Sequence, residues 1–168
     1  MALNFNASSE AMDVNKPLLT RQGSNSEVMN VINGVVSGSI KGLITVGVDP
    51  VYSFPNSKEF TEGYKKLELT LAFAMKQDAT ASLAKMVAAT PHYLESWGDA
   101  QIKKGTYSLA QPTIRPLFNT RQFQDSILQW TGNTQKYYDY IKENWTASML
   151  ESGSWNQTLQ AGFIASDP

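Results

Sequence analysis

The segment 42–48, with the sequence Gly-Leu-Ile-Thr-Val-Gly-Val, constrains the fold most, because it is apolar on consecutive residues and rich in β-branched side chains. Lys41 at one end and the Asp49-Pro50 turn at the other limit it to the length of a strand. Strands that are apolar on both faces are typical of parallel sheets, which helices cover on both sides. We therefore predict a buried parallel strand over 42–48.

Helical and strand patterns alternate around this segment. Ser24 and Glu27 have the spacing of a capping box, and apolar residues then recur at intervals of three and four through Val36. The predicted order is helix, strand, helix, strand, short helix and strand, over 24–36, 42–48, 56–67, 69–75, 78–85 and 86–89. Helices between strands imply crossovers and a parallel sheet. The prediction is an α/β fold, a three-layer α/β/α domain with a mostly parallel, Rossmann-like sheet.

The remaining segments are less regular. Two prolines within 49–55 predict a loop there, and in 92–117 only 106–110 has the pattern of a strand. Helical patterns return after Thr120 and Thr134, and a last helical turn is expected around 155–159. We expect an irregular N-terminal segment over 1–23, an α/β domain over 24–150, and a C-terminal tail over 151–168 that leads to another domain.

Composition excludes several classes of function. The 14 basic and 15 acidic residues leave a net charge of −1, without the basic excess of a nucleic-acid-binding domain. No run of about 18 apolar residues is present, so no direct membrane insertion is expected. The chain has no cysteine, which excludes disulfides and cysteine-ligated iron–sulfur clusters within it, and its one histidine predicts no metal site. Charged residues make up only 17%, which suggests that part of the surface is covered by a neighbour.

The candidate ligand site lies where the predicted strands end. Ligands of open parallel sheets bind beyond the carboxyl ends of the strands, and 47–55, 76–81 and 90–99 leave those ends. Asp49 is also a turn former and Asp78 a helix cap, which would fill an anion site with the chain's own carboxylate. The candidate cofactor-binding residues are Gly47, Asp49, Pro50, Ser53, Asp78, Thr80, His92 and Glu95.

The richest polar cluster is 92–99, which contains His92, Glu95 and Asp99. A histidine beside carboxylates can serve acid–base chemistry, so a small independent hydrolase centred on His92 is one hypothesis. No serine has a recognisable nucleophile motif, however, so no catalytic residue is assigned. The alternative is that His92 and Glu95 bond the backbone of an irregular loop.

Five short segments occur in an order that resembles the molybdopterin oxidoreductase superfamily. They are Arg21-Gln22-Gly23, Gly47-Val48-Asp49-Pro50-Val51-Tyr52, Asp78-Ala79-Thr80-Ala81, Pro91-His92-Tyr93-Leu94-Glu95-Ser96-Trp97-Gly98-Asp99, and Gln111-Pro112-x-Ile114-x-Pro116-Leu117. Within the superfamily the chain looks closest to the iron–sulfur and molybdopterin-like large subunit of alternative complex III, a quinol:cytochrome c oxidoreductase. The resemblance runs over about 17–165 of the 168 residues.

This resemblance implies a fold like the cofactor-binding domains of DMSO reductase and formate dehydrogenase, within a longer parent protein. The segment that matches 47–50 would lie near the guanine dinucleotide of a molybdopterin cofactor in catalytic members. Partners would be other domains and subunits of a membrane-associated respiratory complex on the periplasmic side of the bacterial inner membrane. The chain departs from the family at Ala79, where members often have Glu, and at Thr90, where they often have Leu.

The first hypothesis from the sequence is therefore an internal, non-catalytic domain of an electron-transfer subunit, with no cofactor in the isolated chain. The second is a domain that helps to bind molybdopterin guanine dinucleotide in the parent protein. The hydrolase is the third. The first hypothesis predicts exposed apolar surface where neighbouring parts would pack.

Overall fold

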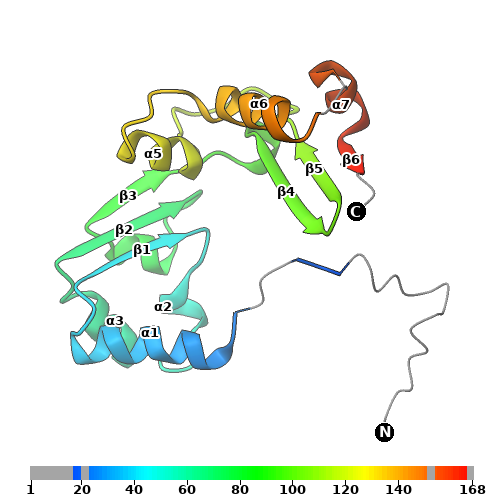
Figure 1. Ribbon diagram of the computed structural model, residues 1–168. Helices are drawn as coiled ribbons and strands as arrows, with labels where there is room; N and C mark the ends of the chain where they lie inside the picture. The colour runs from blue at the N-terminus through cyan, green and yellow to red at the C-terminus, as the bar shows by residue number, and fades with distance from the viewer. Residues whose placement is uncertain (1–16, 20–22, 151–153, 166–168) are drawn as a thin grey trace, which may run out of the picture. The chain divides into compact units, whose positions relative to one another are not determined.

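The computed structural model describes residues 17–19, 23–150 and 154–165, and within it the chain divides into two compact units (Figure 1). Residues 23–96 and 112–137 form what we call the parallel unit. The described parts of 1–22, 97–111 and 138–168 form the antiparallel unit. These units divide the predicted 24–150 domain between them. Most of the predicted N-terminal segment, including Arg21-Gln22, lies outside the described residues.

Three parallel strands form the sheet of the parallel unit. They are β1 (Gly42–Val46), β2 (Leu69–Ala74) and β3 (Met86–Ala89), in the order β1-β2-β3. Gly42 faces Leu69, and Leu71 faces Met86. The α/β class and the parallel direction of the predicted strands are therefore confirmed. The predicted burial of 42–48 is wrong, because β1 lies at the edge of this sheet and Thr45 is its one buried residue.

One face of this sheet is covered by α1 (Asn25–Ser37) and α3 (Ser57–Tyr64), as Figure 1 shows. The predicted capping box starts α1, because the Ser24 hydroxyl accepts from Glu27 N at 3.2 Å and Glu27 accepts from Ser24 N at 3.0 Å. The helix ends at Gly38, whose φ of 75° is the left-handed conformation that glycine adopts without strain. The core under these helices consists of Ile32, Val35, Phe60, Tyr64 and Leu67.

The two helices approach each other most closely at Gly63. A Cβ atom at this position would lie 2.8 Å from the carbonyl oxygen of Val35, closer than non-bonded atoms pack. Only glycine therefore lets α3 lie against the backbone of α1, and this contact fixes α1 on the same face of the sheet as α3.

The other face of the sheet carries α5 (Phe123–Trp130). The ring of Phe73 on β2 packs edge-on against Phe123 at 5.0 Å and against Trp130 at 6.0 Å between ring centroids. Layers therefore lie on both sides of the sheet, as a parallel sheet requires. Two short elements, α4 (Ala79–Leu83) and the 3-10 helix η1 (Tyr93–Glu95), follow β2 and β3.

One loop predicted from the sequence is wrong in part. Within 49–55 the structure has the short helix α2 (Pro50–Ser53). Pro50 lies in the first turn of this helix, where the missing N–H would have had no helical partner. A proline at this position starts a helix instead of excluding one.

The antiparallel unit contains β4 (Gly98–Lys103), β5 (Thr106–Ala110) and β6 (Phe163–Ala165), in that order, with α6 (Tyr137–Ser148) and α7 (Trp155–Ala161). Its core is aromatic: Trp145 is buried, packs edge-on against Trp155 and donates its indole N–H to Asp99 at 2.9 Å. The sequence predicted β5 and the turn that becomes α7. It did not predict β4, which lacks an apolar run, or β6, which is apolar but only three residues long.

The Gly63 contact leads to a first prediction. Gly63→Ala should lower the free energy of unfolding by about 1–3 kcal/mol through overpacking, although alanine favours a helix by about 1 kcal/mol over glycine. Gly34→Ala is the matched control, because its Cβ would meet the Ile40 side chain, which can rotate away. Urea unfolding followed by circular dichroism should place Gly34→Ala within about 1 kcal/mol of the parent. Equal losses for both variants would contradict the close approach.

Candidate functional site

The carboxyl ends of β1 and β2 meet through Asp49. Its Oδ1 accepts hydrogen bonds from Thr80 N at 3.0 Å and from the Thr80 hydroxyl at 2.6 Å, and its Oδ2 accepts from Ala79 N at 3.3 Å. The Thr80 hydroxyl in turn accepts from Val51 N at 3.0 Å. Two of the three segments expected at this edge of the sheet are thus joined by a continuous network of hydrogen bonds.

Asp78 completes the same arrangement. Its carboxylate accepts from Ala81 N at 2.8 Å and caps α4, as the sequence predicted. The first amides of α4, at Ala79, Thr80 and Ala81, therefore all donate to the carboxylates of Asp49 and Asp78. These amides are the groups that would bind an anion at a helix start, and the chain's own carboxylates occupy them.

The environment of Asp49 favours its charged form. Partial burial acts to raise the pKa of this carboxyl, but hydrogen bonds from Thr80, Ala79 and Tyr52 outweigh burial and lower the pKa below its ordinary value. The native state therefore holds Asp49 as a carboxylate, which is the form that accepts these bonds.

The other candidates on the β1 side shape the turn. Gly47 has a φ of 63° and donates its N–H to Phe73 O at 2.9 Å. Pro50 is buried at the start of α2, and the Ser53 hydroxyl donates to Asp49 O at 2.8 Å. These three residues set the backbone that carries the Asp49 carboxylate to α4.

His92 and Glu95 form a separate cluster after β3. His92 Nδ1 accepts from Leu94 N at 3.3 Å, while Glu95 accepts from His92 N at 3.0 Å and from Leu117 N at 3.2 Å. Ser96 donates its hydroxyl to the main-chain oxygen of His92 at 3.2 Å. The histidine and the glutamate thus hold the loop together, and the serine hydroxyl points its proton at a carbonyl instead of at the imidazole.

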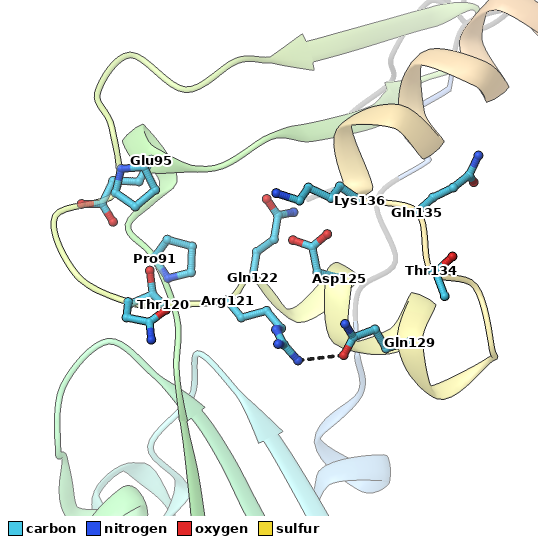
Figure 2. A pocket seen from close by; sticks show the side chains of 12 residues that line it. Pro91, Glu95, Thr120, Arg121, Gln122, Asp125, Gln129, Thr134, Gln135 and Lys136 are labelled. Atoms are coloured by element: carbon cyan, nitrogen blue, oxygen red, sulfur yellow. Dashed lines mark hydrogen bonds between the residues drawn. The ribbon is translucent and has the colours of Figure 1, made fainter.

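Beyond β3 the parallel unit has a polar pocket of about 460 Å³ (Figure 2). Its wall combines both signs of charge with amides, and it includes Pro91, Glu95, Arg121, Gln122, Asp125, Gln129 and Lys136. Arg121 donates to Gln129 at 2.8 Å, and Asp125 accepts from Tyr137 N at 2.7 Å. Among the residues predicted from the sequence only Glu95 lines this pocket.

The sequence carried no signal for the rest of the pocket. Arg121 comes from the segment before α5, Asp125 from α5 itself and Lys136 from the loop after it, with no motif linking them. Arg121 N donates to Ala89 O at 3.1 Å, which ties the start of this segment to the end of β3.

Two further findings concern metal-ligand groups and membrane-spanning helices among the described residues. They contain no group of three or more histidine or carboxylate side chains arranged to hold a metal ion. None of the helices in the described ranges is both long and apolar enough to cross a bilayer.

Asp49 provides the prediction for this site. Because its native pKa is lowered, its contribution to stability is present above the pKa of the unfolded chain and is lost as the pH falls through the native value. Asp49→Asn should cost about 1–2 kcal/mol near pH 7, as for the loss of a helix cap, and should weaken the acid dependence of unfolding. Denaturant titrations from neutral pH into acid measure both effects. The control Glu62→Gln removes an exposed carboxylate paired with Lys65 and should cost at most about 1 kcal/mol; a loss as large as that of Asp49→Asn would argue against a special role for Asp49.

Comparison with known proteins places this arrangement in context. No family model matches the chain. The NADPH-Fe(3+) oxidoreductase subunit alpha of Geobacter sulfurreducens is 30% identical over 91 residues, which are 54% of this chain and 10% of that protein. The menaquinone reductase, molybdopterin-binding-like subunit of Nitratidesulfovibrio vulgaris is 29% identical over 96 residues, or 55% of this chain and 14% of that protein.

The fold has a counterpart among solved structures. Acetylene hydratase from Pelobacter acetylenicus matches 83% of this chain with a TM-score of 0.63 at 12% sequence identity, over 20% of its own length. The chain spans about a tenth of the first curated relatives it matches. The sequence relatives and the shared α/β fold support the resemblance of this chain to the molybdopterin oxidoreductase superfamily.

Proposed function

We propose that this domain is an internal, non-catalytic part of a molybdopterin oxidoreductase-like subunit in a respiratory electron-transfer complex. The coarser statement, a domain of a molybdopterin oxidoreductase-like protein, rests on the relatives above. The relatives named as subunits support the presence of partner subunits.

The observation that carries the proposal is the closed start of α4. In the predicted site, Asp49 and Asp78 accept hydrogen bonds from the amides that a phosphate would need. A phosphate placed there would have to displace one carboxylate and approach the other, which costs electrostatic free energy. The predicted residues 47–53 and 78–80 therefore do not fit a pterin dinucleotide phosphate.

The proposal extends to the surroundings of the parent protein. The resemblance to the large subunit of alternative complex III supports a membrane-associated complex on the periplasmic side of the bacterial inner membrane. The relative called a molybdopterin-binding-like subunit of menaquinone reductase supports a quinone-linked complex of this general kind. The partners would be other domains and subunits of that complex.

A second candidate function is a contribution to cofactor binding through the polar pocket beyond β3. This pocket lies at the carboxyl end of a parallel strand, where ligands of such sheets bind. Glu95 and Asp125 oppose Arg121 and Lys136, so the pocket suits an uncharged polar group such as a guanine base better than a phosphate. If the pterin cofactor binds the parent protein, this pocket is where the present residues could hold its guanine end, while the redox chemistry would be supplied by the cofactor.

The hydrolase hypothesis has less support. Its centre, His92, accepts a backbone hydrogen bond, and the Ser53 and Ser96 hydroxyls donate to main-chain oxygens. A nucleophilic serine would instead donate to the base that activates it.

Thermal unfolding with guanine nucleotides tests the proposal. A ligand at about a hundred times its dissociation constant would stabilise the chain by about 2.7 kcal/mol, so a scaffold domain should show no shift of Tm with guanosine or GDP. A shift with both that Gln122→Ala abolishes would favour the pocket as a guanine site and contradict the purely structural role. Hydrolysis of generic esters that His92→Ala removes would overturn both interpretations.

A further inference from the structure

The strand β1 has an open edge. It is the outermost strand of its sheet, and its described partner is β2. Lys41 O accepts from Glu68 N at 2.8 Å and Gly47 N donates to Phe73 O at 2.9 Å, so the main-chain groups of these two residues face β2. Because these groups alternate in direction along a strand, the N–H and C=O of Ile44 and Val46 face the open edge.

An apolar groove of about 360 Å³ runs beside this edge. Its wall is formed by Val28 and Val31 of α1, Leu43 and Val46 of β1, and Phe54 after α2. Val31 and Ile44 are 39% and 44% exposed, which is high for apolar side chains beside a parallel sheet. The hydroxyl of Thr45, also in the wall, is buried and has no hydrogen-bond partner among the described residues.

The topology gives the direction of a strand that would fill this edge. The chain passes from β1 to β2 through α3, and right-handed crossovers that advance in one direction place their helices on one face of the sheet. α1 enters β1 on the same face as α3, with Val35 and Phe60 in one core. It therefore occupies the place of a crossover helix for a strand on the far side of β1, running parallel to β1.

We infer that the open edge of β1 binds an extended polypeptide segment as a fourth, parallel strand. Its main chain would bond the outward N–H and C=O groups of Ile44 and Val46, and every second side chain would enter the groove under α1. Apolar branched side chains fit this groove, and a polar one near its middle could bond the Thr45 hydroxyl.

The strand comes from another part of the longer polypeptide, and in this respect the inference rests on the proposed function. The relatives are long enough to supply it, since the chain spans 10% and 14% of them. The described segment just before α1 is already paired in the antiparallel unit, where Leu18 bridges to Lys103. The exposed apolar surface is of the kind that the sequence predicted for an internal domain.

Hydrogen exchange on the full 168-residue chain tests the pairing. The probe is a short synthetic peptide of alternating valine and threonine with a lysine at each end. At saturating peptide, the Ile44 and Val46 amides should exchange at least about tenfold more slowly, as for newly bonded amides. The Leu43 and Thr45 amides already face β2 and should not change, which provides an internal control. No slowing at Ile44 and Val46 would overturn the inference.

Variants locate the peptide in the groove. Val31→Glu should weaken peptide binding at least about tenfold by placing an unpaired charge in an apolar site. Val36→Glu is the matched control on the same helix: Val36 is 48% exposed and lies outside the groove, so binding should persist. Equal weakening by both variants would contradict the groove as the site.

Cross-linking separates a parallel strand from the alternatives. Because the chain has no cysteine, Val48→Cys, two residues after the carboxyl end of β1, gives one reactive thiol. With oxidised glutathione as the oxidant, a peptide with cysteine at its C-terminus should form the disulfide, and one with cysteine at its N-terminus should not. The reverse preference would show antiparallel pairing and overturn the inference. A disulfide-linked dimer of Ile44→Cys chains that still forms at saturating peptide would show a second copy as the occupant and would also overturn it. Stabilisation by GDP would contradict the proposed function while leaving these results unchanged.

Discussion

The close approach of α1 and α3 determines the geometry of the parallel unit. Gly63 lets the backbone of α3 lie against Val35, and the buried side chains of Ile32, Phe60 and Tyr64 pack around that contact. Since burying large side chains supplies most of the folding free energy of such a layer, the position of α1 follows from this packing. The groove beside β1 and the turn that carries Asp49 both depend on where these two helices lie.

The network around Asp49 shows how a ligand-binding edge can become a structural one. Helix starts at the carboxyl end of a parallel sheet offer free amides, and here Asp49 and Asp78 accept hydrogen bonds from all three described amides at the start of α4. The result ties β1 to the segment after β2 without any bound group. The predicted cofactor edge therefore serves as a joint between strands.

Local patterns predicted the parallel unit well, because each signal has a local physical cause. The capping box at Ser24 and the Asp78 cap appear as predicted, and the apolar run forms the parallel strand β1, although at the exposed edge of the sheet and not in its buried centre. The sequence could not predict what depends on long-range contacts. Arg121 and Lys136 join Glu95 in one pocket only after folding, and β4 pairs through residues without an apolar pattern. The prediction at Pro50 was wrong because proline was taken as a helix breaker, although in a first turn it favours a helix.

The open edge of β1 has a consequence for how such a domain is made in the cell. Among the described residues, the outward main-chain groups of Ile44 and Val46 have no strand partner and lie beside branched apolar side chains, which is the combination that templates aggregation between nascent chains. A polypeptide that contains this domain would be vulnerable to aggregation from the moment that β1 and β2 pair until another strand covers the open edge. Chaperone demand during synthesis should therefore be set by the delay before that covering step, and not by the stability of the finished domain.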